Sequence, residues 1–215
     1  MNDHNLLSEV EFSSFFNYSP RGTSETARKS RRVKDLLKNC SPPERLEAMV
    51  KALAERVPGS ALEPFLNPSV GLVPAPRASQ LKEGALWPAK TLCDLLVKYK
   101  LGGQVSPIVE RHTTIRTSKS SPGNRPEPPE HLATLNIKNE LIEHSAITVI
   151  DDIITKGATL LACASKVAKR FPSASLRCFA FQRTRGLQDD IEHVIEIVSG
   201  QIRYDAKSGH LFREP

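Results

Sequence analysis

Apolar residues gather in several short stretches of the chain, and each stretch ends in polar or turn-forming residues. The clearest of them, Ile147 to Ile150, is rich in β-branched residues, which is typical of a strand covered on both faces of a sheet. The same pattern predicts further strands at residues 69–76, 105–109, 176–181 and 193–198, with a last hairpin after residue 199. The chain therefore contains enough strand-forming sequence for one central sheet.

Between these stretches, apolar residues recur at helical spacing. Helices are predicted at residues 24–38, 41–57, 86–99 and 160–170. The second begins with Ser41 as its expected N-cap and Glu44 three residues later, as in a capping box. Residues 1–20 follow neither period and are predicted to be irregular or marginally helical. Strands that alternate with helices indicate an α/β fold on a parallel sheet.

Two acids, Asp151 and Asp152, follow the clearest strand, and a short loop connects them to the last predicted helix. The loop consists of Thr155, Lys156, Gly157, Ala158 and Thr159. The start of a helix presents free N–H groups to an anion, and the loop adds two hydroxyls and one positive charge. Ligands of such sheets bind at the C-terminal ends of strands. The pattern therefore suits a ligand that carries both hydroxyls and a phosphate.

The order of strand, two acids, two apolar residues and Thr-x-Gly-x-Thr resembles the phosphoribosyl-pyrophosphate (PRPP) signature of type I phosphoribosyltransferases. By this resemblance, Asp151 and Asp152 would be the catalytic acids that hold the ribose hydroxyls, and residues 155–159 would bind the 5′-phosphate. Mg²⁺ would enter as a cofactor with PRPP, so that the two acids contact it only indirectly, through the ribose. Lys156 departs from the family, which usually has a small residue there.

A second segment, Val73-Pro74-Ala75-Pro76-Arg77, resembles the Val-Pro-x-Pro segment of the ComF branch of this family. The resemblance implies that Arg77 contacts the pyrophosphate, whereas a rigid strand exit without a ligand role is the alternative. The zinc-binding cysteines that usually precede this region in ComF proteins are absent from the sequence.

The stretch from Arg111 to His131 has four prolines and few apolar residues, a composition typical of a functional lid or a disordered insertion. It occupies the position of the family's flexible hood, which we place at about residues 110–132. A hood of this kind closes over PRPP, and Lys119 would then contact the pyrophosphate. After the next strand, Arg183 and Arg185 could reach the ligand or remain in solvent.

The resemblance implies a phosphoribosyltransferase-type, Rossmann-like core with a helical N-terminal extension. We place the extension at residues 1–60 and the phosphoribosyltransferase-like domain at residues 61–215. The net charge of +6 suits a polyanionic ligand but does not identify one. The densest basic run, residues 28–34, is either a solvated helix face or a contact with nucleic acid. It has no interleaved aromatic residues, so a base-stacking platform is not indicated.

The sequence also bears on the compartment. It contains no run of about 18 apolar residues and begins without a signal-peptide pattern, so no membrane association is expected. The four cysteines are widely spaced and form no Cys-x-x-Cys pair. This spacing argues against a zinc site and predicts reduced thiols in the cytoplasm.

The resemblance leaves the function open between two classes. An active enzyme would transfer the phosphoribosyl group to a nitrogen acceptor such as ammonia, a purine or a pyrimidine. A non-catalytic protein on the same fold would sense PRPP or act on DNA, as a ComF-like relative could. A protein partner that docks on the aromatic cluster at residues 12–16 or on the basic helix is a third alternative. Homodimers are common in this fold, but the sequence does not demonstrate one.

Overall fold

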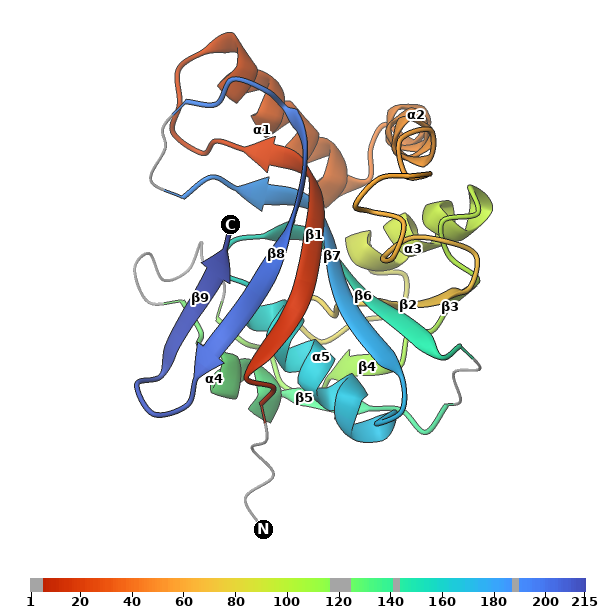
Figure 1. Ribbon diagram of the computed structural model, residues 1–215, viewed down its shortest axis with the longest axis vertical. Coiled ribbons are helices and arrows are strands. Elements are labelled where there is room, and N and C mark those ends of the chain that lie inside the picture. The colour runs from red at the N-terminus through yellow and green to blue at the C-terminus, as the bar shows by residue number, and fades with distance from the viewer. Residues whose placement is uncertain (1–5, 117–124, 141–143, 187–189) are drawn as a thin grey trace.

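The computed structural model describes residues 6–116, 125–140, 144–186 and 190–215. Its centre is a sheet made of β1 (Glu9–Tyr18), β2 (Val70–Pro74), β3 (Gln104–Val105), β6 (Ala146–Ile154), β7 (Ser175–Thr184), β8 (Ile195–Asp205) and β9 (His210–Glu214). The strand order is β3-β2-β6-β7-β1-β8-β9 (Figure 1). The five strands from β3 to β1 are parallel, and β8 and β9 complete the sheet as antiparallel strands. The predicted α/β fold with a parallel sheet is confirmed.

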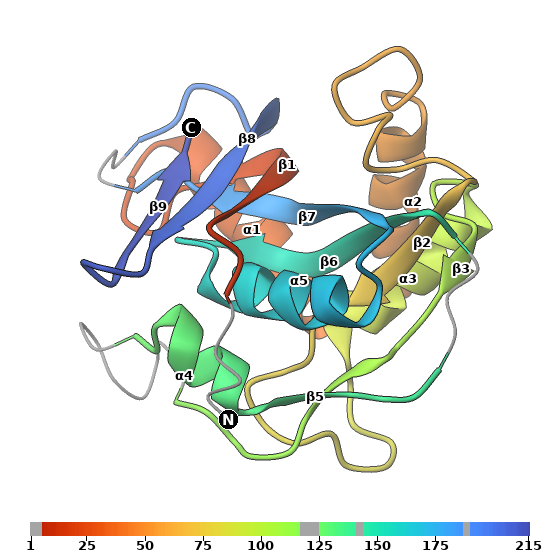
Figure 2. The same cartoon turned by 60° about the horizontal axis from the view of Figure 1, so that its bottom comes forward.

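Helices cover both faces of this sheet (Figure 2). One face carries α1 (Glu25–Asn39), α2 (Pro43–Ala54) and α3 (Pro88–Lys98), and the other carries α5 (Ala158–Arg170). Below α5 lie the short helix α4 (Pro128–Ala133) and a two-stranded sheet of β4 (Val109–Arg111) and β5 (Leu135–Ile137). The predicted hood therefore contains regular structure on both sides of residues 117–124, which lie outside the described part of the chain.

The central strand β6 explains why the strongest apolar run of the sequence lacks alternation. Ile147 and Val149 pack in the core beneath α5, whereas Ile150 packs in the core beneath α1 and α3. The one polar residue of that run, Thr148, is buried and donates its hydroxyl to the carbonyl oxygen of Phe65 at 2.8 Å. Both faces of the strand are thus buried without leaving its polar side chain unsatisfied.

The predicted helices are present, with one difference at a cap. Helix α1 begins after Ser24, whose hydroxyl accepts a hydrogen bond from the N–H of Ala27 at 3.1 Å. The expected capping box at Ser41 and Glu44 is wrong, because α2 begins after Pro42 without a side-chain cap. Proline at the first helical position lacks an N–H, so that the helix start has one donor fewer to satisfy.

The N-terminal segment differs most from the prediction, because residues 9–18 form β1 rather than irregular or helical structure. This strand lies between β7 and β8, with Phe12 opposite Cys178 on one side and Gly200 on the other (Figure 1). Its partners are more than 150 residues away in the sequence, so no local pattern could reveal the pairing. The boundary at residue 60 stays a prediction, although this extension contributes a strand to the sheet.

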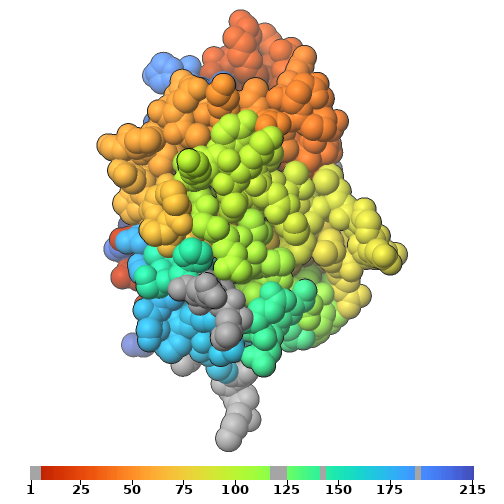
Figure 3. All heavy atoms as spheres, turned by 90° about the vertical axis from the view of Figure 1, so that its right-hand side faces the viewer, coloured from red at the N-terminus to blue at the C-terminus, as the bar shows by residue number. Residues whose placement is uncertain are grey.

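The expected strand at residues 105–109 is interrupted. Residues 104–105 pair with β2, and the chain then turns at Ser106 into β4, which belongs to the second sheet. Figure 3 shows the face covered by α2 and α3, from which the segment between β2 and α3 projects. Among the described helices, none is long and apolar enough to span a membrane.

The aromatic centre of the core offers a test of the packing. Phe179 is fully buried, and its ring lies edge-on to Phe181 with the centroids 5.2 Å apart. We expect Phe179→Ala to lower the free energy of unfolding by about 3–5 kcal/mol, because it removes apolar contacts and leaves a cavity. Phe212, which is 48% exposed on β9, provides the control. Denaturant unfolding should show a much smaller loss for Phe212→Ala; equal losses would contradict the assigned core.

Candidate functional site

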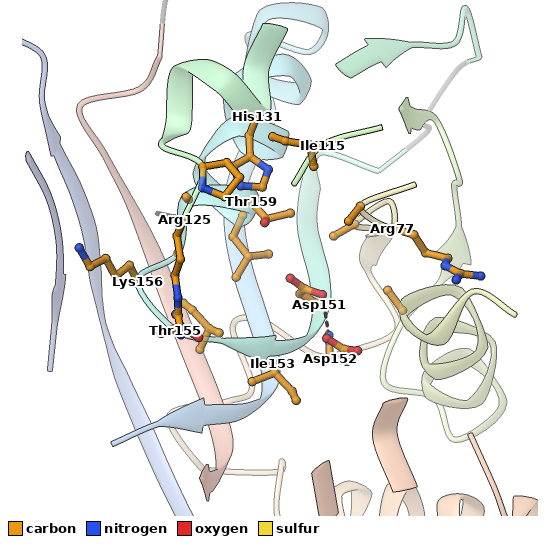
Figure 4. Close-up of a pocket in the computed structure, with 18 of the residues that line it drawn as sticks. Arg77, Ile115, Arg125, His131, Asp151, Asp152, Ile153, Thr155, Lys156 and Thr159 are labelled. Atoms are coloured by element: carbon orange, nitrogen blue, oxygen red, sulfur yellow. Dashed lines mark hydrogen bonds between the residues drawn. The ribbon is translucent and has the colours of Figure 1, made fainter. Parts of the chain in front are cut away.

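A cavity of about 730 Å³ opens at the C-terminal ends of the parallel strands. It is bordered by the end of β1, the loop after β2, the end of β6 and the start of α5. The described parts of the hood and one side of α1 complete its walls (Figure 4). This is the edge of an open α/β sheet at which ligands are expected to bind.

The two predicted acids lie within this cavity, on β6 itself rather than after it. Because successive residues of a strand point to opposite faces, Asp151 and Asp152 have different neighbours. The backbone N–H of Asp152 donates to a carboxylate oxygen of Asp151 at 2.8 Å, which is the dashed contact in Figure 4. Burial, and secondly the charge of Asp152, raise the pKa of Asp151 to about 8. The raised pKa favours the protonated form of Asp151, and a protonated carboxyl group can donate as well as accept a hydrogen bond.

The carboxylate of Asp152 is paired with Lys38 of α1. The ammonium lies 2.8 Å from one oxygen of Asp152 and 2.7 Å from the other. Burial lowers the pKa of Lys38, but the charges of Asp152 and Asp151 outweigh it, and the net change is upward. Lys38 was not among the residues predicted from the sequence. The available signal was Lys34, which belongs to the basic run, lies one helical turn earlier and also lines the cavity.

The loop between β6 and α5 lies where the sequence predicts it, and all five of its residues line the cavity. Gly157 has a φ of 98°, and a Cβ atom there would lie 2.9 Å from the side chain of Ile202. Glycine is therefore required both by the backbone conformation and by the close approach of β8. The hydroxyl of Thr155 lies 3.3 Å from that of Thr184, and Lys156 is exposed and points away from the acids (Figure 4). The start of α5 thus faces the cavity with its free N–H groups.

The basic residues of the hood have distinct positions. Arg111 is only 6% exposed and donates to the carbonyl oxygen of Arg77 at 2.8 Å and to the hydroxyl of Thr134. Arg116 forms an ion pair with Glu130. Arg125 extends toward Thr155 in the loop (Figure 4).

The remaining basic residues predicted to contact the ligand do not lie as expected or are not described. Arg77 lines the cavity, but its guanidinium donates to the carbonyl oxygen of Leu86 at 2.6 Å and points away from the acids (Figure 4). Lys119 lies outside the described residues. Arg183 and Arg185 do not line the cavity; they pair with Glu196 at 3.1 and 3.7 Å. The idea that these two arginines reach the ligand is therefore not supported.

The cavity is strongly basic. Its lining includes seven basic residues, namely Lys34, Lys38, Arg77, Arg111, Arg116, Arg125 and Lys156, against the three acids Glu127, Asp151 and Asp152. An excess of positive charge inside a concave site concentrates anions. The lining therefore suits a ligand with more than one phosphate group.

The same lining bears on the expected Mg²⁺. Both oxygens of Asp152 contact the ammonium of Lys38. Among the described residues, no group of three or more His, Cys, Asp and Glu side chains could hold a metal ion. Magnesium prefers several oxygen ligands in octahedral geometry. These residues do not fit a Mg²⁺ held directly by the protein, and they leave room only for an ion that arrives on the ligand.

Known proteins that resemble this chain are found only among solved structures, and the similarity is remote. No protein-family model and no curated protein matches this chain. The chain is similar to a solved hypoxanthine phosphoribosyltransferase from Staphylococcus aureus, with 16% identity over 70% of each chain and a TM-score of 0.38. It is also similar to a solved hypoxanthine phosphoribosyltransferase from Trypanosoma cruzi, with 16% identity and a TM-score of 0.31. This match covers 89% of the present chain and 76% of the T. cruzi chain.

The glycine of the loop can be tested by substitution. We expect Gly157→Ala to lower the free energy of unfolding by about 1–3 kcal/mol, because alanine is strained at this φ and its Cβ meets Ile202. The control is Gly209→Ala, since Gly209 has a φ of 70° but nothing within 4 Å of the point where a Cβ atom would lie. Thermal or denaturant unfolding should show the larger loss for Gly157→Ala. Equal losses would mean that the contact with Ile202 imposes no cost.

A second test concerns His131, a buried residue of α4 in the hood, with Nδ1 3.4 Å from the guanidinium of Arg111. Burial, and secondly the charge of Arg111, lower the pKa of His131 from 6.5 to about 4. As the pH falls below 6.5, the unfolded chain takes up this proton before the folded protein does. The stability linked to neutral His131 is therefore complete above pH 6.5 and is lost progressively toward pH 4.

We expect this loss to reach about 3 kcal/mol. It should be absent from His131→Gln, whose amide can still accept from Arg111 but does not titrate. Urea unfolding of both proteins between pH 7 and pH 4 measures the difference. Parallel pH profiles would show that His131 is not buried in its neutral form.

Proposed function

We propose that the cavity binds PRPP or a related ribose phosphate and that the protein transfers the phosphoribosyl group to a nitrogen acceptor. The observation that carries this proposal is the unit at the end of β6. Two adjacent acids and a glycine-containing helix start lie within one basic cavity, separated by only two residues. Hydroxyl-binding and phosphate-binding groups are thereby held at a short, fixed separation, as a sugar phosphate requires.

The 5′-phosphate would bind at the start of α5. Free N–H groups and the positive end of the helix dipole favour an anion there. The hydroxyl of Thr159 borders the same space, and Arg125 extends over the loop from the hood (Figure 4). The predicted role of residues 155–159 is retained in this proposal, although the exposed Lys156 contributes charge from the rim rather than from the floor.

The ribose would lie over the two acids. Protonated Asp151 can donate to one ribose hydroxyl, and the carboxylate of Asp152 can accept from the other. The pyrophosphate would extend toward the loop after β2, where Arg111 and Arg116 supply positive charge. Arg77 and Lys119 stay predictions for this end of the ligand. A volume of about 730 Å³ lies within the range of sites that bury ligands of nucleotide size.

The reaction would break the bond between ribose C1 and the pyrophosphate oxygen and form a bond from C1 to the acceptor nitrogen. The pyrophosphate leaves with the bonding electrons, and the acceptor loses a proton. Basic side chains around the leaving group would stabilise its growing charge, and positioning would supply most of the remaining rate gain. Closure of the hood would exclude water and limit hydrolysis.

The alternative, a non-catalytic or DNA-related protein, receives no further support from the basic run. Within this run, Lys29 pairs with Glu25, Arg31 donates to two backbone carbonyls, and Lys34 lines the cavity. The run is thus divided between the helix surface and the proposed ligand site. The ComF-like subtype, a homodimer, a nucleic-acid or protein partner and a cytoplasmic location stay predictions. The aromatic cluster at residues 12–16 as the docking surface is wrong, because Phe12, Phe15 and Phe16 are buried in the core.

Calorimetric titration with PRPP in the presence of Mg²⁺ tests the binding proposal. We expect saturable binding by the wild type and a loss of at least about tenfold in affinity for the double variant Asp151→Asn, Asp152→Asn. Asp94→Asn removes a carboxylate that is paired with Lys90 on the surface and serves as the control. Thermal unfolding should confirm that each variant is folded. Unchanged binding by the double variant, or no binding by folded wild type, would refute the proposal.

A further inference from the structure

The ammonium of Lys38 occupies the position next to Asp152 at which a bound cation would be expected. It lies 2.8 and 2.7 Å from the two carboxylate oxygens, and thus spans the carboxylate rather than touching one end of it. The side chain of Asp152 is 6% exposed, whereas that of Lys38 is 51% exposed. Both residues line the cavity. The carboxylate is therefore largely withdrawn from solvent, while the cation that neutralises it stays accessible to a ligand.

The position of Lys38 is set by the helix that carries it. Lys38 lies in the last turn of α1, next to the fully buried Leu37, and the helix ends at Cys40 in a left-handed conformation. Helix α1 packs against β1 and β6, so the lysine approaches the acid from a rigid element. Lys34, one turn earlier, lines the same cavity. This arrangement differs from a flexible surface lysine that meets an acid by chance.

The ammonium of Lys38 keeps a free N–H donor when it pairs with Asp152. A lysine ammonium has three N–H donors, and two oxygens of Asp152 use at most two of them. The third can donate to an oxygen of a ligand in the cavity. A divalent ion at Asp152 would first have to displace the lysine, and a buried charge that loses its partner is strongly disfavoured. No third ligating side chain is grouped with the two acids within the described chain, so such an ion would gain little in return.

We propose that Lys38 takes the place of a divalent cation at the acid pair, so that the cavity binds PRPP-like ribose phosphates without Mg²⁺. This inference rests on the proposed function and deepens it, because it assigns a ligand-contacting role to a residue of the N-terminal helix. Lys38 neutralises Asp152 and holds an oxygen of the ribose or of its diphosphate. The other basic side chains of the cavity neutralise the remaining phosphate charge.

The test compares PRPP binding in EDTA with binding in excess Mg²⁺, measured by calorimetry. We expect the wild-type affinity to differ by less than about threefold between the two conditions. Lys38→Met should lose at least about tenfold in EDTA, the effect of one charge-assisted hydrogen bond. Excess Mg²⁺ should restore most of this loss, because the ion can then approach the unpaired carboxylate of Asp152. A merely structural ion pair would not produce this conditional rescue.

The matched control is Lys29→Met. It removes one lysine from the same helix, where Lys29 pairs with Glu25 at 2.8 Å on the exposed side. Its binding should follow that of the wild type in both conditions. The wild-type comparison also requires no variant, so the inference stays testable if Lys38→Met does not fold.

The outcomes separate the inference from the proposed function. Binding by the wild type only with Mg²⁺ would overturn the inference and leave the proposed function intact. Binding by Lys38→Met in EDTA with wild-type affinity would also overturn it, because Lys38 would then be a structural partner of Asp152 alone. Failure of the folded wild type to bind PRPP in either condition would overturn both.

Discussion

The parallel pairing of β6 with β2 on one side and β7 on the other determines where every other part of the site lies. The pairing with β2 ends at Pro74 opposite Ile150, while the pairing with β7 continues to Ile154. The N–H of the next residue, Ala75, still donates to the carbonyl oxygen of Ile150 at 2.8 Å, and the chain of β2 then leaves the sheet. Asp151 and Asp152 follow this divergence directly. One edge of β6 is thus released at the point where its acids occur, and the cavity lies between the separated strands.

The positive charges around this opening are compensated to different degrees, since Lys38 pairs with Asp152 and Arg116 pairs with Glu130. Arg111 instead donates to the neutral oxygens of Arg77 and Thr134, and it forms no ion pair with an acid among the described residues. Its proximity in turn disfavours a charged His131. The base of the hood is therefore tied to the loop after β2 by a cation that borders the cavity. A polyphosphate ligand would supply the missing negative charge.

The acid pair follows a different arrangement. Adjacent carboxylates in a buried strand cannot both ionise without cost, since each charge disfavours the other. The ammonium of Lys38 neutralises Asp152, and the raised pKa of Asp151 favours protonation of its carboxyl group. Both carboxyl groups line the cavity, where each can bind a hydroxyl of a ligand. If a side chain is the cation of such a site, its presence depends on the folding of the protein and not on the metal concentration.

The local units of this protein follow from short stretches of its sequence. The β6 strand, its acids, the glycine-containing loop and α5 are contiguous, and their order depends on interactions within a few residues, so the pattern was sufficient to predict them. The main helices follow from a period of 3.6 residues in the same way. Contacts between segments that are far apart in the chain, in contrast, depend on the tertiary structure. It placed residues 9–18 inside the sheet, because a buried strand acquires partners on both edges only when β7 and β8 are present. It also brought Lys38 to Asp152, 114 residues along the chain, and raised the pKa of Asp151 by burial. Long-range pairing and the burial of charged groups arise only in the packed protein. A local periodicity of apolar residues therefore cannot predict them.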